Sequence, residues 1–215
     1  MLIQENLVET RRSARYFVAG EINPSVRHVW FVLHGYGQLG EDFLGDCMPL
    51  LREGTVLVAP EALSRFYHRS GRGSIGASWM TSEDRLREID DYLIFLNGIW
   101  ESIVTQIGTI PELSILGFSQ GGATAMRWGC RGEGKPRRIV LWGAGFPEVE
   151  LEAYRDRLSQ MTLLLIQGRE DRIVSKSEIE KTVKKLQEIG GGVEQIYHSG
   201  GHELRSEVLA DIVLK

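Results

Sequence analysis

One serine stands in a setting that would make it a nucleophile. The segment Gly117-Phe118-Ser119-Gln120-Gly121 fits the pattern G-x-S-x-G, in which a sharp turn from strand to helix lifts the serine hydroxyl out of a sheet. Both glycines are needed because side chains two positions from the serine would collide in so tight a turn. The apolar run LSIL precedes the segment, and GGATAMRWG, rich in small residues, follows the serine. An ordinary glycine turn is the alternative, but these flanks favour a nucleophile at Ser119.

A serine hydroxyl is a weak nucleophile at neutral pH and needs a base such as histidine. The chain has five histidines, at positions 28, 34, 68, 198 and 202. We favour His202 as the base because it follows the last expected strand in the segment SGGHEL, where Gly200 and Gly201 let the backbone bend toward the nucleophile. His198 is the rival, but no glycine precedes it closely.

The base needs a carboxylate that fixes its tautomer and stabilises the imidazolium. Asp171 lies just past the apolar run TLLLIQG and precedes Arg-Ile-Val, as an inward-facing carboxylate in a short loop would. Glu170 is its neighbour and rival. The chain order Ser119, Asp171, His202 favours Asp171, because α/β-hydrolases carry their triad in this order.

The tetrahedral oxyanion of acyl transfer needs N–H donors that are already in place. One expected donor is the backbone amide of Gln120, the residue after the nucleophile. The other comes from the loop His34-Gly35-Tyr36-Gly37-Gln38, which follows an early strand. We assign it to the amide of Tyr36, with Gly37 as the second choice, although a simple glycine turn into the next helix would also produce this segment.

The elements that must position these residues alternate between strands and helices, which predicts a mostly parallel sheet covered on both faces. An apolar stripe from Leu86 to Ile107 at spacings of three and four predicts a long helix. Residues 2–20 are expected to form an antiparallel hairpin, and residues 61–80 a long loop. The expected strands are 28–33, 55–59, 113–118, 139–142, 162–166 and 193–197.

The fold predicted from these elements is a three-layer α/β-hydrolase sandwich, with residues 1–215 forming a single domain. Only 19 residues separate the strands 139–142 and 162–166. This length allows one short helix and no cap domain, so the active site is expected to be open. Trp79, near the end of the 61–80 loop, is a candidate for substrate contact, or else a core anchor for the helix that follows.

Composition narrows the possible partners. The chain has 42% hydrophobic and 25% charged residues, a net charge of −4 and scattered basic residues, which argues against a nucleic-acid groove. His198 and His202 lack the companions of a zinc site, so we expect no metal and no cofactor. No apolar run is long enough to span a membrane, and no signal peptide is recognisable. We therefore expect a cytoplasmic protein, with its oligomeric state left open.

The segments LHGYGQ, VAPEAL, SWM, GFSQGG, GREDRIV and GGHEL together resemble the phospholipase/carboxylesterase family, which includes the acyl-protein thioesterases. The resemblance implies ester or thioester substrates, no cofactor, and Ser119, Asp171 and His202 as the triad. The sequence departs from the thioesterases at Tyr36 and Gln38, where they usually carry Leu and Asp, and in the polar 61–80 loop. These departures favour a smaller ester over an acyl-protein.

The sequence therefore predicts a serine hydrolase that cleaves small carboxylic esters or thioesters through an acyl-enzyme. A non-catalytic ligand-binding protein of the same fold stays open as an alternative, since fold alone does not determine function. Perhydrolysis or lactone opening in the same site is a further alternative.

Overall fold

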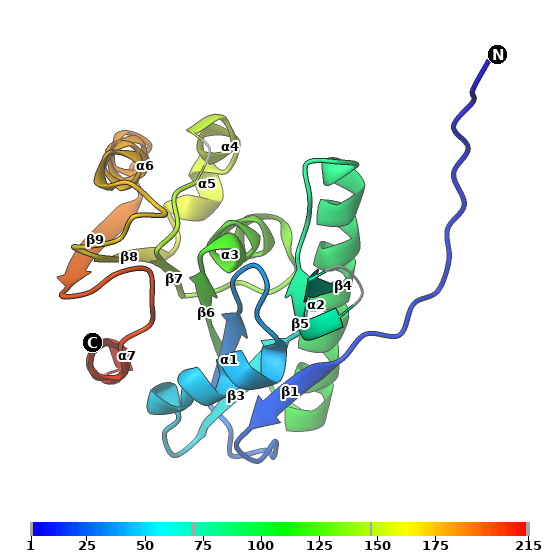
Figure 1. Ribbon diagram of the computed structural model, residues 1–215. Coiled ribbons are helices and arrows are strands. Elements are labelled where there is room, and N and C mark those ends of the chain that lie inside the picture. The colour runs from blue at the N-terminus through cyan, green and yellow to red at the C-terminus, as the bar shows by residue number, and fades with distance from the viewer. Residues whose placement is uncertain (1, 70–71, 147, 214–215) are drawn as a thin grey trace.

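A seven-stranded sheet runs through the middle of the molecule (Figure 1). The computed structural model describes residues 2–69, 72–146 and 148–213. The strand order is β1-β3-β2-β6-β7-β8-β9, and every neighbouring pair is parallel except β1 with β3. The strands are β1 (Tyr16–Ala19), β2 (His28–Leu33), β3 (Thr55–Pro60), β6 (Glu112–Phe118), β7 (Arg138–Trp142), β8 (Thr162–Gly168) and β9 (Gly192–His198).

The central strands are apolar on both faces because helices cover both. In β2, Val29 and Phe31 point into one core cluster, whereas Trp30 and Val32 point into the other. This alternation is the two-residue period of a strand, and nearly continuous apolar runs are typical of parallel sheets buried on both sides.

The helices form the two outer layers. One face packs against α2 (Arg85–Ile107), α3 (Gln120–Arg131), α4 (Glu148–Ala153), α5 (Arg155–Leu158) and α6 (Lys176–Glu188). The other packs against α1 (Gly40–Asp46), the short 3₁₀ helix η1 (Met48–Leu50) and α7 (Ser206–Val213). The predicted α/β-hydrolase architecture with a mostly parallel sheet is confirmed (Figure 1).

The prediction of an N-terminal hairpin over residues 2–20 is wrong. Only β1 pairs with the sheet, and residues 2–15 form neither strand nor helix. The N-terminal end of this segment extends away from the body in Figure 1, whereas residues 10–14 border a pocket beside α2, and Glu5 contacts Arg87 at 3.3 Å. Its apolar residues come in adjacent pairs, Leu2–Ile3 and Leu7–Val8, which are between 66% and 96% exposed. Adjacent residues point to opposite faces of a strand, so these pairs would give a second strand no apolar face to bury.

Residues 61–80 are also not the expected loop. They contain a second, two-stranded sheet, in which β4 (Ser64–Arg69) pairs with the antiparallel β5 (Arg72–Ser78). The expected helix after it is present as α2, but Leu86 is 72% exposed. The helix begins at Arg85, and its buried stripe starts one turn later, at Ile89.

Between β7 and β8 the chain forms two short helices, α4 and α5, where one was expected. They have six and four residues. Within the described ranges, no helix is long and apolar enough to cross a membrane.

Candidate active site

Ser119 lies at the turn between β6 and α3, in a strained backbone conformation with φ 52° and ψ −118°. Non-glycine residues rarely adopt positive φ, and such strain concentrates at functional sites. Close packing of the turn enforces it: a Cβ at Gly117 would lie 2.3 Å from the carbonyl oxygen of Gly121. The Ser119 amide donates to the carbonyl of Trp142 at 2.9 Å, which ties the turn to β7.

Asp171 and His202 form a hydrogen-bonded pair. His202 Nδ1 lies 2.8 Å from Asp171 Oδ2, and the carboxylate side chain is only 1% exposed. The other carboxylate oxygen accepts from the amides of Ile173 at 2.8 Å and Val174 at 3.0 Å. Burial raises the pKa of Asp171, but the hydrogen bonds from His202, Val174 and Ile173 outweigh it and hold this pKa below its usual value. An ionised Asp171 can fix the imidazole with its Nδ1–H toward the carboxylate and Nε2 free as a base.

The imidazole of His202 packs between the residue before Ser119 and the glycine that follows β7. Its ring centroid is 4.8 Å from that of Phe118, the residue before Ser119. A Cβ at Gly143 would lie 3.0 Å from both Cε1 and Nδ1 of His202, and Gly143 follows Trp142, which holds the Ser119 amide. A side chain at 143 would crowd the ring, and the positive φ of Gly143, 55°, also favours glycine there.

The structure joins two of the three predicted triad residues directly. Asp171 and His202 are hydrogen-bonded, whereas no hydrogen bond links the Ser119 hydroxyl to His202 among the described residues. Catalytic hydrogen bonds are often long or misaligned without substrate and tighten when it binds.

The two expected oxyanion donors differ in how they are held. Gln120 is the first residue of α3, so its amide has no acceptor within the helix. Its side chain accepts from the Trp79 amide at 3.0 Å and donates to the Met80 carbonyl at 2.8 Å, which fastens the helix start to the segment after β5. No local sequence pattern indicates this anchoring role.

Tyr36 lies in the loop after β2 with its ring stacked on Phe66 of β4, the centroids 5.0 Å apart. The second choice, Gly37, has its amide engaged with the carbonyl of Ala77 at 2.9 Å. The carbonyl of Gly37 accepts from His68 Nε2 at 3.0 Å. The β4–β5 hairpin therefore holds Gly37 through both of its backbone groups.

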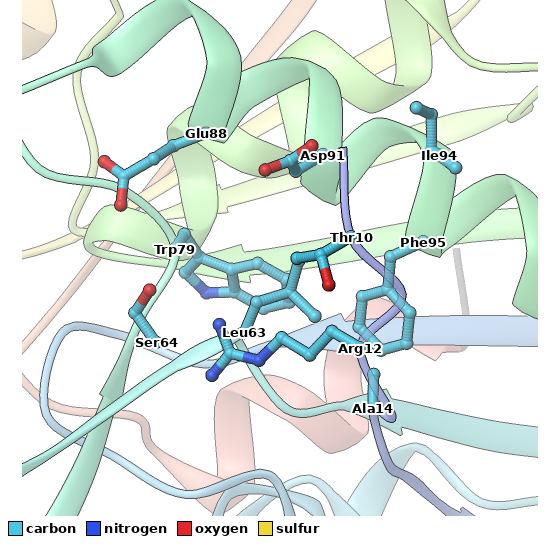
Figure 2. Close-up of a pocket in the computed structure, with 10 residues that line it drawn as sticks. All are labelled: Thr10, Arg12, Ala14, Leu63, Ser64, Trp79, Glu88, Asp91, Ile94 and Phe95. Atoms are coloured by element: carbon cyan, nitrogen blue, oxygen red, sulfur yellow. The ribbon is translucent and has the colours of Figure 1, made fainter. Parts of the chain in front are cut away.

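Trp79 is placed mainly as a core side chain. It is 2% exposed, its indole N–H donates to the His34 carbonyl at 2.8 Å, and its ring packs edge-on against Tyr92. It also lines a pocket of about 450 Å³ between α2, residues 10–14 and the start of β4 (Figure 2). A role of Trp79 in substrate binding stays a prediction.

The rival residues lie apart from this arrangement. His198 is 6% exposed, and its Nδ1 bonds to the Ser199 carbonyl at 3.2 Å. Glu170 is exposed. Within the part of the chain that the structure describes, no group of three or more His, Cys, Asp or Glu side chains is placed to hold a metal ion.

The chain matches the model of one protein family over most of its length. A family model described as serine hydrolase (FSH1) matches residues 30–206. This range includes all three predicted triad residues and both oxyanion candidates. No curated protein sequence matches the chain.

Solved structures resemble the fold over nearly its whole length. Acyl-protein thioesterase 2 of Zea mays is 20% identical with a TM-score of 0.74, over 94% of this chain and 97% of that one. Esterase PE8 is 23% identical with a TM-score of 0.73, over the same shares. A phospholipase/carboxylesterase from Dyadobacter fermentans DSM 18053 is 20% identical with a TM-score of 0.70, over 96% and 99%. At these identities the likeness shows the fold.

Proposed function

The chain belongs to the FSH1 serine hydrolase family, and on that premise we propose that it hydrolyses small carboxylic esters or thioesters through a triad of Ser119, His202 and Asp171. The observation that carries the proposal is the 2.8 Å contact of a buried carboxylate with an imidazole that packs on the ring of Phe118, the residue before a strained serine. This is the order of groups that nucleophilic catalysis by serine requires.

The reaction proceeds in two similar halves. Ser119 Oγ attacks the acyl carbonyl while His202 Nε2 takes the hydroxyl proton, and the new oxyanion accepts hydrogen bonds from the amides of Tyr36 and Gln120. His202 then gives the proton to the leaving alcohol or thiol as its bond to the acyl carbon breaks. Water repeats the attack on the acyl-enzyme and releases the carboxylic acid. Asp171 stays ionised throughout and stabilises the imidazolium.

The preference for small substrates rests on the site's surroundings. The helices α4 and α5 have six and four residues, too few to form a domain over the serine. Beside His202 lies a hollow of about 250 Å³, below the roughly 300–1,000 Å³ of most ligand pockets. Its lining is part polar and part apolar: Gln38, Asp46, Phe118, His202, Glu203, Leu204 and Ser206. A long acyl chain would find little continuous apolar wall there.

A fluorophosphonate probe tests the catalytic assignment, because it bonds covalently to activated serines. We expect the wild-type protein to be labelled and Ser119→Ala not to be. Ser159→Ala is a matched control, since Ser159 is exposed and its hydroxyl only donates to the Asp156 carbonyl. Labelling of Ser119→Ala as fast as wild type would place the nucleophile elsewhere, and an unlabelled wild type would favour a ligand-binding protein.

A series of p-nitrophenyl esters tests the substrate class. We expect kcat/KM to be highest for short acyl chains, because the hollow beside His202 is small and partly polar. A steep rise in kcat/KM from butyrate to palmitate would contradict the small-substrate proposal without affecting the triad.

A further inference from the structure

The buried histidine at the end of β2 is not needed as the base of the proposed mechanism. His34 is fully buried, and its ring lies 5.1 Å from that of Trp79, the two held together by the bond from the Trp79 indole to the His34 carbonyl. Both ring nitrogens have partners in the backbone. Nδ1 lies 2.7 Å from the carbonyl of Gly35, and Nε2 lies 3.0 Å from the amide of Ala62.

These partners fix the tautomer of His34. The Ala62 amide can only donate, so Nε2 must be the unprotonated acceptor. The ring proton then sits on Nδ1 and is donated to the Gly35 carbonyl. Burial lowers the pKa of His34, although its bond to Gly35 and the charge of Glu61 act in the opposite direction. The neutral ring with its proton on Nδ1 is therefore the form that the site keeps.

The carbonyl that His34 holds belongs to the same peptide unit as the amide of Tyr36. This peptide is trans, so its C=O and N–H point in opposite directions. The Gly35 carbonyl receives a second hydrogen bond from the Gln38 amide at 3.2 Å. With two donors on the carbonyl, the direction of the Tyr36 N–H is determined. Among the residues that the structure describes, no acceptor pairs with this N–H, so it is free to bind an oxyanion.

We propose that His34 is a positioning residue, which aims the Tyr36 amide at the oxyanion by holding the carbonyl of Gly35. The proposal rests on the proposed hydrolase function. His34 does not touch the substrate. It acts through one peptide unit, and its own orientation is set by Ala62 on one side and Trp79 on the other. A hydrogen bond to the carbonyl also polarises the peptide, which strengthens its N–H as a donor.

Two substitutions separate this role from a merely structural one. In His34→Asn the side-chain nitrogen is as many bonds from the backbone as Nδ1, so a donor to Gly35 is kept and the acceptor for Ala62 is lost. In His34→Gln the amide reaches the position of Nε2, so an acceptor for Ala62 is kept and the donor to Gly35 is lost. His28→Gln is the control, because it makes the same change at the other end of β2, where Nε2 contacts only Ser114 and the more distant Glu112.

The assay is hydrolysis of p-nitrophenyl acetate, with thermal melting measured on each variant. Removing one oxyanion donor costs on the order of 100- to 1,000-fold in kcat, and we expect a loss approaching about 100-fold in His34→Gln with little change in KM. His34→Asn should recover most of kcat even where it melts at a lower temperature. The affinity for a trifluoromethyl ketone, which forms a tetrahedral adduct with serine, should fall in parallel with kcat/KM.

Two results would overturn the inference. In the first, the kcat of His34→Gln equals that of wild type and of His28→Gln. In the second, the losses of kcat in both His34 variants follow their losses in melting temperature. Failure of the proposed function is a different result: wild type would then neither hydrolyse the ester nor react with a fluorophosphonate, and the inference would fall with it.

Discussion

Gly121, two residues after the nucleophile, offers a sharp test of how the serine is positioned. A Cβ at this position would lie 2.1 Å from the carbonyl oxygen of Leu33 and 2.5 Å from that of His34. Real Cβ atoms essentially never approach within 3.0 Å of a neighbour. Both obstacles are backbone atoms at the end of the central strand β2 and cannot rotate away as a side chain would.

The size of the effect follows from this overlap. In Gly121→Ala the start of α3 must move by about 1 Å, the difference between 2.1 and 3.0 Å, and a displacement of about 1 Å in an active site can cost about 100-fold in rate. Overpacking of this kind also costs about 1–3 kcal/mol of stability. The displacement separates the Ser119 hydroxyl and the Gln120 amide from His202 and Tyr36, so we expect kcat/KM for p-nitrophenyl acetate to fall by about 100-fold.

Gly98→Ala is the matched control, because it makes the same chemical change in the interior of α2, where a Cβ would meet nothing within 4 Å. It should stabilise the protein by up to about 1 kcal/mol, since alanine favours the helix, and leave kcat/KM unchanged. The experiment compares kcat/KM with the melting temperature for both variants. If Gly121→Ala retained wild-type kcat/KM while folded, close packing of α3 on β2 would not be what positions the nucleophile.

Three further predictions concern the carboxylates of Asp171 and Glu150 and the N-terminal segment. Asp171→Asn should lower kcat by roughly 10⁴-fold with the fold intact, because the amide favours the wrong tautomer of His202; stopped-time ester assays measure this, and a loss below about tenfold would contradict it. Glu150→Gln should destabilise the fold by about 3 kcal/mol, because it leaves the nearly buried Arg127 without a counter-charge. The hydrogen bond from Arg127 holds the pKa of Glu150 below its usual value, so this stabilisation is present above the unfolded pKa and is lost as pH falls through the folded one. Chemical denaturation from pH 7 down to pH 3 should show the difference between wild type and Glu150→Gln shrinking, and a constant difference would refute the ion pair's role. Deleting residues 2–9 should leave the melting temperature and kcat/KM nearly unchanged, since the apolar side chains there are exposed, and a large drop in either would show that the segment packs on the body.

The catalytic residues could be predicted where a short sequence motif surrounds them. Ser119 was found because the glycines its turn requires lie two residues away on either side. Asp171 is predictable because it closely follows the buried apolar strand β8, and His202 because it follows the last strand after two glycines; the ends of parallel strands meet at one edge of a sheet. The contact of 2.8 Å between them joins residues 31 positions apart, so the sequence could give their order but not their geometry.

The rest depended on contacts with no local signal. The β4–β5 hairpin is polar and contains Gly73 and Gly76, so it lacks the apolar alternation by which strands are recognised. Trp79 is a candidate for substrate contact by its position in the sequence, yet its indole is buried in the core and donates to the His34 carbonyl. The positioning role proposed for His34 has no local signal, because its partners are the carbonyl of Gly35 and the amide of Ala62, 28 residues further along the chain.

The central claim is that Ser119 carries the acyl group during turnover. Its most direct test is to mix the protein with p-nitrophenyl acetate, quench it with acid within the first turnovers, and map the modified peptide by mass spectrometry. We expect one acetyl group on Ser119, its loss on further incubation as water releases acetate, and none in the denatured protein. Rapid ester hydrolysis with no acyl group on Ser119, or with the acetyl on another residue, would contradict it.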